Sequence, residues 1–212
     1  MRLYALSRVP KLSALFLADI HLHQQLKFVH KIFSDAIHFA TKEMKPGPIL
    51  ELVNPKGEKK FFIGTTPILP PTGKISVWSK WAACNYFNAW WLVDYSYALD
   101  AEFKNRFNIL ATSEEHLRLQ DIVLTNIVPK LFPRPKEEGR TVDEFPVSLG
   151  PTIGEILPRI KPETDVVDIY KMHYRAQKGR VRMKWTNRER PAFIDAPAPG
   201  EQAVIEFKEP LL

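Results

Sequence analysis

The chain has 212 residues, of which 45% are hydrophobic and 25% are charged, and this balance excludes whole-chain disorder and indicates one ordinary globular domain. Its one cysteine, Cys84, excludes an intramolecular disulfide and favours a reducing compartment such as the cytoplasm. The formal net charge of +6 is compatible with a polyanionic partner.

Two apolar stretches, residues 12–18 and 81–99, are the candidates for a signal peptide and a membrane span. The first is followed by charged residues and histidines, without a small-residue cleavage site. The second is interrupted by Asn85, Asn88 and Asp94, whereas a spanning helix needs about twenty apolar residues. The sequence therefore predicts a cytoplasmic protein that does not engage a membrane.

Apolar residues at 3.6-residue spacing predict a first helix from about Ile20 to Lys42, with Asp19 as its N-cap. A Pro-Gly-Pro sequence at 46–48 ends that helix, since proline lacks the helical N–H. Short apolar runs on either side of a turn signal at 54–57 then predict a small β-hairpin near residues 49–63.

The second predicted helix runs from Ser76 to about Phe107 and is apolar around most of its circumference, which is typical of a helix buried at the centre of its domain. Thr112 begins a third helix, and Thr164 caps a fourth that continues to about Gln177. We therefore predict a mainly α fold, with a helical single domain over residues 1–190, the small β-hairpin near 49–63, and a C-terminal tail over residues 191–212.

The positive charge is concentrated near the C-terminus. Eight of the 30 basic residues lie between positions 171 and 190 with one acid, Glu189, so this segment carries +7 and the other 192 residues carry −1. A solvated surface is the ordinary alternative, but such surfaces carry both signs. We interpret residues 178–190 as an extended arm that follows DNA phosphates, with an aromatic ring that stacks on a base. The candidate phosphate-binding residues are Lys178, Arg180, Arg182, Lys184, Trp185, Arg188 and Arg190.

Metal and nucleotide motifs are weak in this sequence. Asp19, His21 and His23 form a D-x-H-x-H cluster, but positions two apart on a helix point about 200° apart and do not face one ion. The chain has neither a G-x-x-x-x-G-K-[ST] loop nor a G-x-G-x-x-G loop. We predict no metal site and no cofactor.

A series of short motifs, spread in order over most of the chain, resembles a group of small phage-encoded proteins commonly labelled pyrimidine-dimer DNA glycosylase-like. The motifs are Asp19-x-His21, Trp78-Ser79-Lys80, Asn85-Tyr86, Trp91-Leu92, Glu102-Phe103-x-x-Arg106-Phe107, His116, Tyr170-x-x-His173-Tyr174 with Lys178, and Trp185-x-Asn187-Arg188-Glu189-x-Pro191. For a phage protein, the expected location is the host cell cytoplasm.

The resemblance implies action on a DNA base or on its N-glycosidic bond. Such a reaction passes through an oxocarbenium-like sugar, which a carboxylate stabilises or an amine attacks, and the base must leave the stack. The candidate catalytic residues are Asp19, His21, Glu102 and His116. The candidate substrate-binding residues are Trp78, Lys80, Asn85, Arg106, Tyr170, His173 and Tyr174.

These side chains also have structural interpretations, which the sequence leaves open. Glu102 and Arg106 share a helix face at i, i+4 and are equally explained as an ion pair that orients the helix. Asp19 is equally explained as an N-cap. Asn85 needs hydrogen-bond partners inside an apolar helix, and these belong either to a base edge or to a neighbouring loop. The catalytic hypothesis places His21, Asn85, Glu102, Arg106 and His116 in one pocket.

The leading functional prediction is a DNA-binding protein that acts on a base or its N-glycosidic bond, in phage DNA repair or base modification. The first alternative is a non-catalytic accessory or inhibitory DNA-binding phage protein. The second is an enzyme that acts on free nucleotides and uses the basic residues on a single phosphate. DNA is the predicted partner, and the sequence indicates no oligomeric state.

Overall fold

The computed structural model describes residues 3–42, 47, 49–64, 66–71, 73, 75–109, 132, 142–147 and 160–196. Its elements in chain order are α1 (Pro10–Leu15), α2 (Asp19–Thr41), β1 (Ile49–Val53), β2 (Lys59–Ile63), β3 (Thr66–Ile68), α3 (Val77–Cys84), α4 (Tyr86–Phe107), α8 (Val166–Ala176) and the 3-10 turns η3 (Gln177–Gly179) and η4 (Ala192–Ile194). The prediction of a mainly α fold with a small β-hairpin is confirmed.

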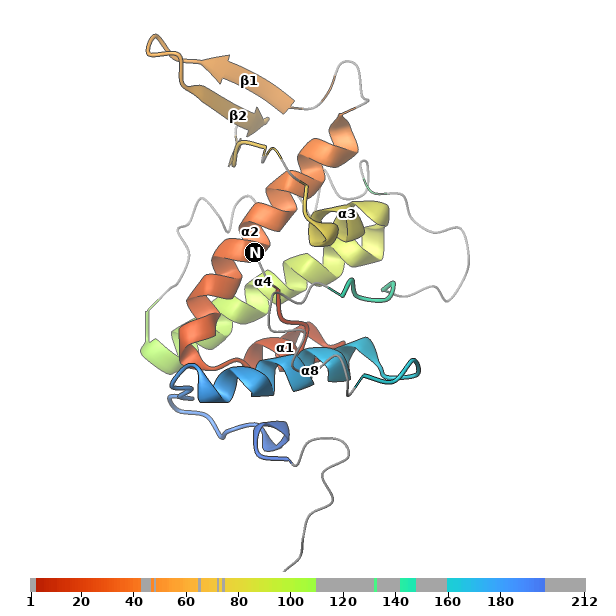
Figure 1. Ribbon diagram of the computed structural model, residues 1–212. Coiled ribbons are helices and arrows are strands. Elements are labelled where there is room, and N and C mark those ends of the chain that lie inside the picture. The colour runs from red at the N-terminus through yellow and green to blue at the C-terminus, as the bar shows by residue number, and fades with distance from the viewer. Residues whose placement is uncertain are drawn as a thin grey trace, which may run out of the picture.

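Helices α2 and α4 form the centre of the fold. They pack against each other, α3 packs against both, and α1 packs against α4. The apolar stripe predicted for α2 is buried, with Leu22, Leu26 and Val29 among its members. The sheet projects from the C-terminal end of α2, while α1 and α8 lie at the opposite end of the molecule (Figure 1). The basic segment that follows α8 is therefore far from the sheet.

The chain before α1 is part of the core. Leu3, Ala5 and Leu6 are buried, and the Tyr4 N–H donates to the side-chain oxygen of Gln25 in α2 at 2.8 Å. Because this segment lies inside the helical body, it brings the N-terminal residues into contact with helices distant in sequence.

The predicted helix over 76–107 is two helices, α3 and α4, so the prediction of one continuous helix is wrong. The backbone is extended at Asn85 (φ −158°, ψ 167°), and its side-chain oxygen accepts the N–H of Asn88 at 3.0 Å. Asparagine competes for backbone hydrogen bonds in this way and therefore favours helix N-caps over helix interiors. The apolar periodicity on both sides conceals this break in the sequence.

Two other predicted caps are displaced by one residue. Ala18 is the N-cap of α2, and Asp19 is its first helical residue, with a side chain that contacts a distant segment. Asp165 caps α8 in place of Thr164, because its carboxylate accepts the N–H of Val167 at 2.7 Å. The helices themselves lie where the periodicity predicts them.

The small β-hairpin forms as predicted, with Ile49 opposite Ile63 in antiparallel register. Its turn is the predicted one, since Gly57 has φ +79° and its N–H donates to the Asn54 carbonyl at 2.9 Å. Glycine adopts this left-handed conformation without steric cost. Strand β3 extends the hairpin to three strands, which the sequence did not predict.

Two sequence predictions fall mainly outside the described residues. The helix expected to begin at Thr112 lies entirely outside them. Of the expected C-terminal tail, residues 191–196 are described, and they form η4 with the side chain of Ile194 buried.

Candidate nucleic-acid interface

The basic segment, residues 178–190, lies against the N-terminal end of α2. The Asp19 N–H donates to the Lys184 carbonyl at 2.8 Å, and the Asp19 carboxylate accepts the Thr186 N–H at 3.1 Å and the Thr186 hydroxyl at 2.7 Å. The Trp185 indole N–H donates to the Phe16 carbonyl at 3.2 Å. These contacts fix the middle of the segment on the body of the molecule.

This packing corrects two expectations about the segment. The predicted arm is attached to the body of the molecule, because its backbone and side chains bond to α2 and to the end of α1. The Trp185 side chain is buried, with the Arg190 guanidinium 5.6 Å from its ring centroid, so it does not present a free face for base stacking. Trp185 holds the segment in place.

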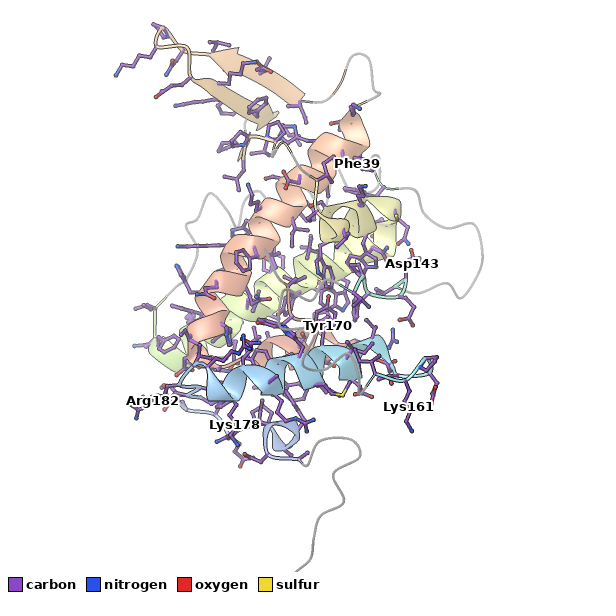
Figure 2. The ribbon with its side chains drawn as sticks, in the orientation of Figure 1. Phe39, Asp143, Lys161, Tyr170, Lys178 and Arg182 are labelled. Carbon is purple, nitrogen blue, oxygen red and sulfur yellow. The ribbon has the colours of Figure 1, made fainter. Side chains whose placement is uncertain are left out.

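The cations of the segment remain on the surface. Exposure alternates along 180–185, which turns three basic side chains outward while Trp185 points inward. Figure 2 shows Lys178 and Arg182 at the outer edge of the molecule. The exposed basic side chains are Lys178, Arg180, Arg182, Lys184, Arg188 and Arg190.

Their charges are neutralised to different degrees. Lys178 and Arg190 share the carboxylate of Asp195, at 2.7 Å and 3.0 Å. Within the part of the chain that the structure describes, Arg182 and Lys184 form no ion pair. These two side chains are therefore exposed cations that no described carboxylate neutralises.

Beneath the segment, Arg106 is the centre of a buried network. Its guanidinium donates to the Glu102 carboxylate at 2.7 Å, to the Asp19 carboxylate at 2.9 Å, and to the carbonyls of Leu17 and Leu15 at 2.7 Å and 2.9 Å. The Arg106 side chain is fully buried. It joins the end of α1 and the start of α2 to the last turns of α4.

The predicted pairing of Glu102 with Arg106 is present, and a second arginine completes it. Arg188 donates to both oxygens of Glu102, at 2.8 Å and 3.1 Å, in a two-pronged contact. Burial alone would raise the pKa of Glu102, but hydrogen bonds from Arg188 and Arg106 outweigh it and lower the pKa below its ordinary value. The carboxylate is therefore ionised near neutral pH and cannot act there as a proton donor.

His21 lies on the same side of the fold, in a mostly buried pair with Tyr174. The Tyr174 hydroxyl accepts the Ala18 N–H at 2.6 Å and lies 2.7 Å from the His21 Nδ1. Burial lowers the pKa of His21 to about 4, so the ring is neutral at pH 7 and shares a hydrogen bond with the Tyr174 hydroxyl. This arrangement ties α8 to the start of α2.

Asn85 belongs to a separate cluster at the other end of α4, so the predicted single pocket is not formed. Asn85 and Asn88 both donate to the Asp143 carboxylate, and Asn88 also accepts the Asp143 N–H at 2.9 Å. Seventeen residues of helix separate Asn85 from Glu102, a distance of about 25 Å at 1.5 Å per residue. The sequence left two kinds of partner open for Asn85, a base edge and a neighbouring loop. In the structure its partner is the neighbouring loop, at Asp143.

Most of the predicted substrate-binding aromatic residues lie in the core. The Trp78 ring lies 6.0 Å from the Tyr170 ring and 5.3 Å from the Trp81 ring, measured between centroids. The Tyr170 hydroxyl donates to the Pro146 carbonyl at 2.6 Å, and Figure 2 shows this tyrosine among the packed helices. His173 is fully buried. None of these side chains presents a surface to a ligand in this conformation.

Lys80, in contrast, is exposed on α3. His116 lies outside the described residues. Among the residues that the structure describes, no group of three or more His, Cys, Asp or Glu side chains is arranged to hold a metal ion. In the same part of the chain, no helix is both long and apolar enough to cross a membrane.

A surface pocket of about 560 Å³ lies beside the buried network. It is lined by Leu15 and Phe16 and by the continuous segment 187–192. Arg188 belongs both to this lining and to the ion pair with Glu102. Sequence analysis predicted the arginines but missed Leu15 and Phe16, because nothing local in the sequence joins the end of α1 to residues more than 170 positions away.

We compared the chain with models of protein families, with curated proteins and with solved structures, and found no match in any of the three.

Proposed function

We propose that this protein binds DNA through the exposed cations of residues 178–190. One observation carries the proposal: the segment is fixed on the body by Trp185 and Thr186, and this leaves Arg182 and Lys184 exposed without a described acidic partner. Cations in this state are available to replace the counterions of a phosphate backbone.

The anchoring supports the proposal physically. A free arm would lose conformational entropy on binding, and that loss would weaken its affinity. The contacts of Asp19 and Trp185 already restrict the conformation of the segment in the folded protein, before DNA binds. The basic surface is therefore pre-organised, and a larger part of each phosphate contact contributes to affinity.

The test is the salt dependence of DNA binding. Each phosphate contact contributes about 0.9 to the slope of log affinity against log salt concentration on duplex DNA. We expect Arg182→Gln with Lys184→Gln to reduce this slope by about 2 and to weaken binding similarly on unrelated sequences. A matched control, Lys56→Gln with Lys60→Gln, removes the same charge from exposed residues of the distant hairpin. Equal effects of the two double variants, or binding that does not fall with salt, would refute the proposal.

Action on a base or its N-glycosidic bond is the second candidate function. The observation that favours it is the pocket beside the Glu102–Arg188 ion pair, at the edge of the basic segment. Incubation with ultraviolet-damaged, modified and plain DNA, followed by assays for released base and abasic sites, tests this function. If DNA binds but no substrate yields a product, the accessory or inhibitory alternative replaces it.

A further inference from the structure

We propose that the pocket formed by Leu15, Phe16 and residues 187–192 binds one nucleotide unit, with its phosphate on Arg188 and Arg190 and its base against Leu15 and Phe16. The unit is either a free nucleoside monophosphate or a single nucleotide of a DNA strand. This inference deepens the proposed function, because it names the part of the ligand that the basic segment takes up individually.

The phosphate end of the pocket is defined by two guanidinium groups. The Arg188 guanidinium donates from Nε and Nη2 to Glu102 and from Nη1 to the Asn187 carbonyl at 3.5 Å, so its plane is fixed, and Arg188 lines the pocket. Arg190 forms an ion pair with Asp195, with 3.0 Å between Nη2 and the carboxylate, and its guanidinium packs over Trp185. Both side chains keep unused donors, and arginine matches the geometry of phosphate oxygens with two parallel hydrogen bonds.

The opposite wall is apolar and suits a planar ring. Leu15 and Phe16 are only partly buried, although both are large apolar side chains. The Phe16 ring is held edge-on by Phe193, with centroids 5.7 Å apart and planes at 72°. An aromatic ring held in this way is a stacking surface for a base.

The size of the pocket and the polarity of its lining restrict the class of ligand further. The volume of about 560 Å³ lies within the range of about 300–1,000 Å³ found for small-molecule sites. An uncharged hydrophobic ligand would leave both arginines unused, and inorganic phosphate would leave the apolar wall unused. Asn187 and Glu189 also line the pocket, and they supply an amide and a carboxylate for a base edge or a sugar hydroxyl.

The geometry gives Glu102 a positioning role in this site. Glu102 is itself held by Arg106, and its two oxygens set the orientation of Arg188. Glu102 therefore influences the ligand only by orienting Arg188, and it does not contact the ligand itself. Glu102→Gln should therefore weaken nucleotide binding less than Arg188→Gln, since glutamine keeps one acceptor oxygen for Arg188.

The experiment is calorimetric titration of the full chain with dTMP and dAMP, with thymidine and inorganic phosphate as partial ligands. Ala192→Trp fills the pocket from an exposed position and leaves every charge in place. Arg188→Gln removes one of the two guanidinium groups assigned to the phosphate, and Lys60→Gln removes an equal charge from the distant hairpin. We expect the first two variants to weaken nucleotide binding by about tenfold to a hundredfold, and Lys60→Gln to leave it unchanged. Thermal unfolding confirms that each variant is folded.

The outcomes separate this inference from the proposed function. If Ala192→Trp loses mononucleotides but keeps duplex and single-stranded DNA, the ligand is a free nucleotide. If it loses both, the ligand is a nucleotide within a strand. Nucleotide binding without salt-dependent DNA binding would overturn the proposed function alone. Failure of both nucleotides to bind, or equal binding by Ala192→Trp and the unchanged protein, would overturn the inference.

Discussion

At the scale of single residues, Arg106 shows how the sequence and the structure differ in what they reveal. The i, i+4 spacing predicts its pairing with Glu102, which the structure contains at 2.7 Å. The contacts with Asp19, Leu15 and Leu17 cross 87 to 91 positions of sequence and have no local signature. Spacing on one helix therefore predicts the pair, while only the fold reveals that this arginine joins three helices.

Substitution of Arg106 by methionine should be strongly destabilising. It would leave two carboxylates without their buried cation and two carbonyls without a donor, and breaking one side of a buried ion pair typically costs about 3–5 kcal/mol. The free energy of unfolding in urea measures this loss. Lys104→Met, on an exposed position of the same helix, should change the stability by less than about 0.5 kcal/mol. Equal stabilities of the two variants would contradict the role of Arg106 described above.

His21 makes stability depend on pH. Its pKa is lowered by burial to about 4 in the folded protein, against an ordinary histidine pKa of 6.5. The unfolded chain therefore binds more protons between pH 6.5 and pH 4, and stability falls as the pH falls through that range. We expect a loss of about 2 kcal/mol between pH 7 and pH 5, a window that lies above the ordinary pKa of Glu102.

The control for this prediction is His21→Gln, which does not titrate in that window. Its urea unfolding free energy should change less than that of the unchanged protein between pH 7 and pH 5. The same pH-dependent loss in both proteins would show that other groups are responsible.

At the scale of elements, the sequence pattern located α2, α8, the hairpin and the region of α3 and α4, but it missed α1 and some of the helix ends. The stripe of α2 and the turn at 54–57 are set by local sequence, and both are observed. The ends depend on which polar side chain takes a backbone N–H, and Asn85 and Asp165 do so at positions where the sequence pattern favoured other solutions. The break at Asn85 makes this residue an N-cap and directs its side-chain amide to the loop at Asp143.

The N-cap role of Asn85 predicts a graded mutational series. Asn85→Ala should lower the unfolding free energy by about 1–2 kcal/mol, because the Asn88 N–H and the Asp143 carboxylate both lose a partner. Asn85→Ser should recover part of this loss, since serine caps helices but does not reach as far. Asn105→Ala on the exposed side of α4 is the control. If alanine and serine gave the same stability, the cap would not be the stabilising interaction.

At the scale of the whole molecule, contacts between residues 16–19 and residues 185–186 join segments that are far apart in the sequence. Asp19 at the start of α2 binds Thr186 across 167 positions of sequence, and Trp185 binds the Phe16 carbonyl across 169. The sequence shows that residues 171–190 are basic, but it does not show that they are anchored. Charge is a property of composition, whereas anchoring requires the N-terminal segment to lie beneath them. The same contacts form the pocket, which is lined by Leu15 and Phe16 on one side and by residues 187–192 on the other.

Weakening the contacts that hold the basic segment on the body should have two effects. It should expose the segment to proteolysis, and it should weaken the binding of the segment to DNA. Thr186→Val keeps the side-chain volume but removes the hydroxyl that donates to Asp19 at 2.7 Å. Trypsin cleaves after lysine and arginine, so the segment contains many sites that its contacts with α2 protect. We expect faster cleavage within 178–190, identified by mass spectrometry, while cleavage at Lys56 and Lys60 in the hairpin proceeds at an unchanged rate.

DNA affinity should fall in the same variant although no cation is lost. The reason is that the conformational entropy of the segment is then lost on DNA binding instead of on folding. Faster cleavage with unchanged affinity would mean that anchoring does not contribute to binding, and unchanged cleavage would mean that the Thr186 hydroxyl does not hold the segment.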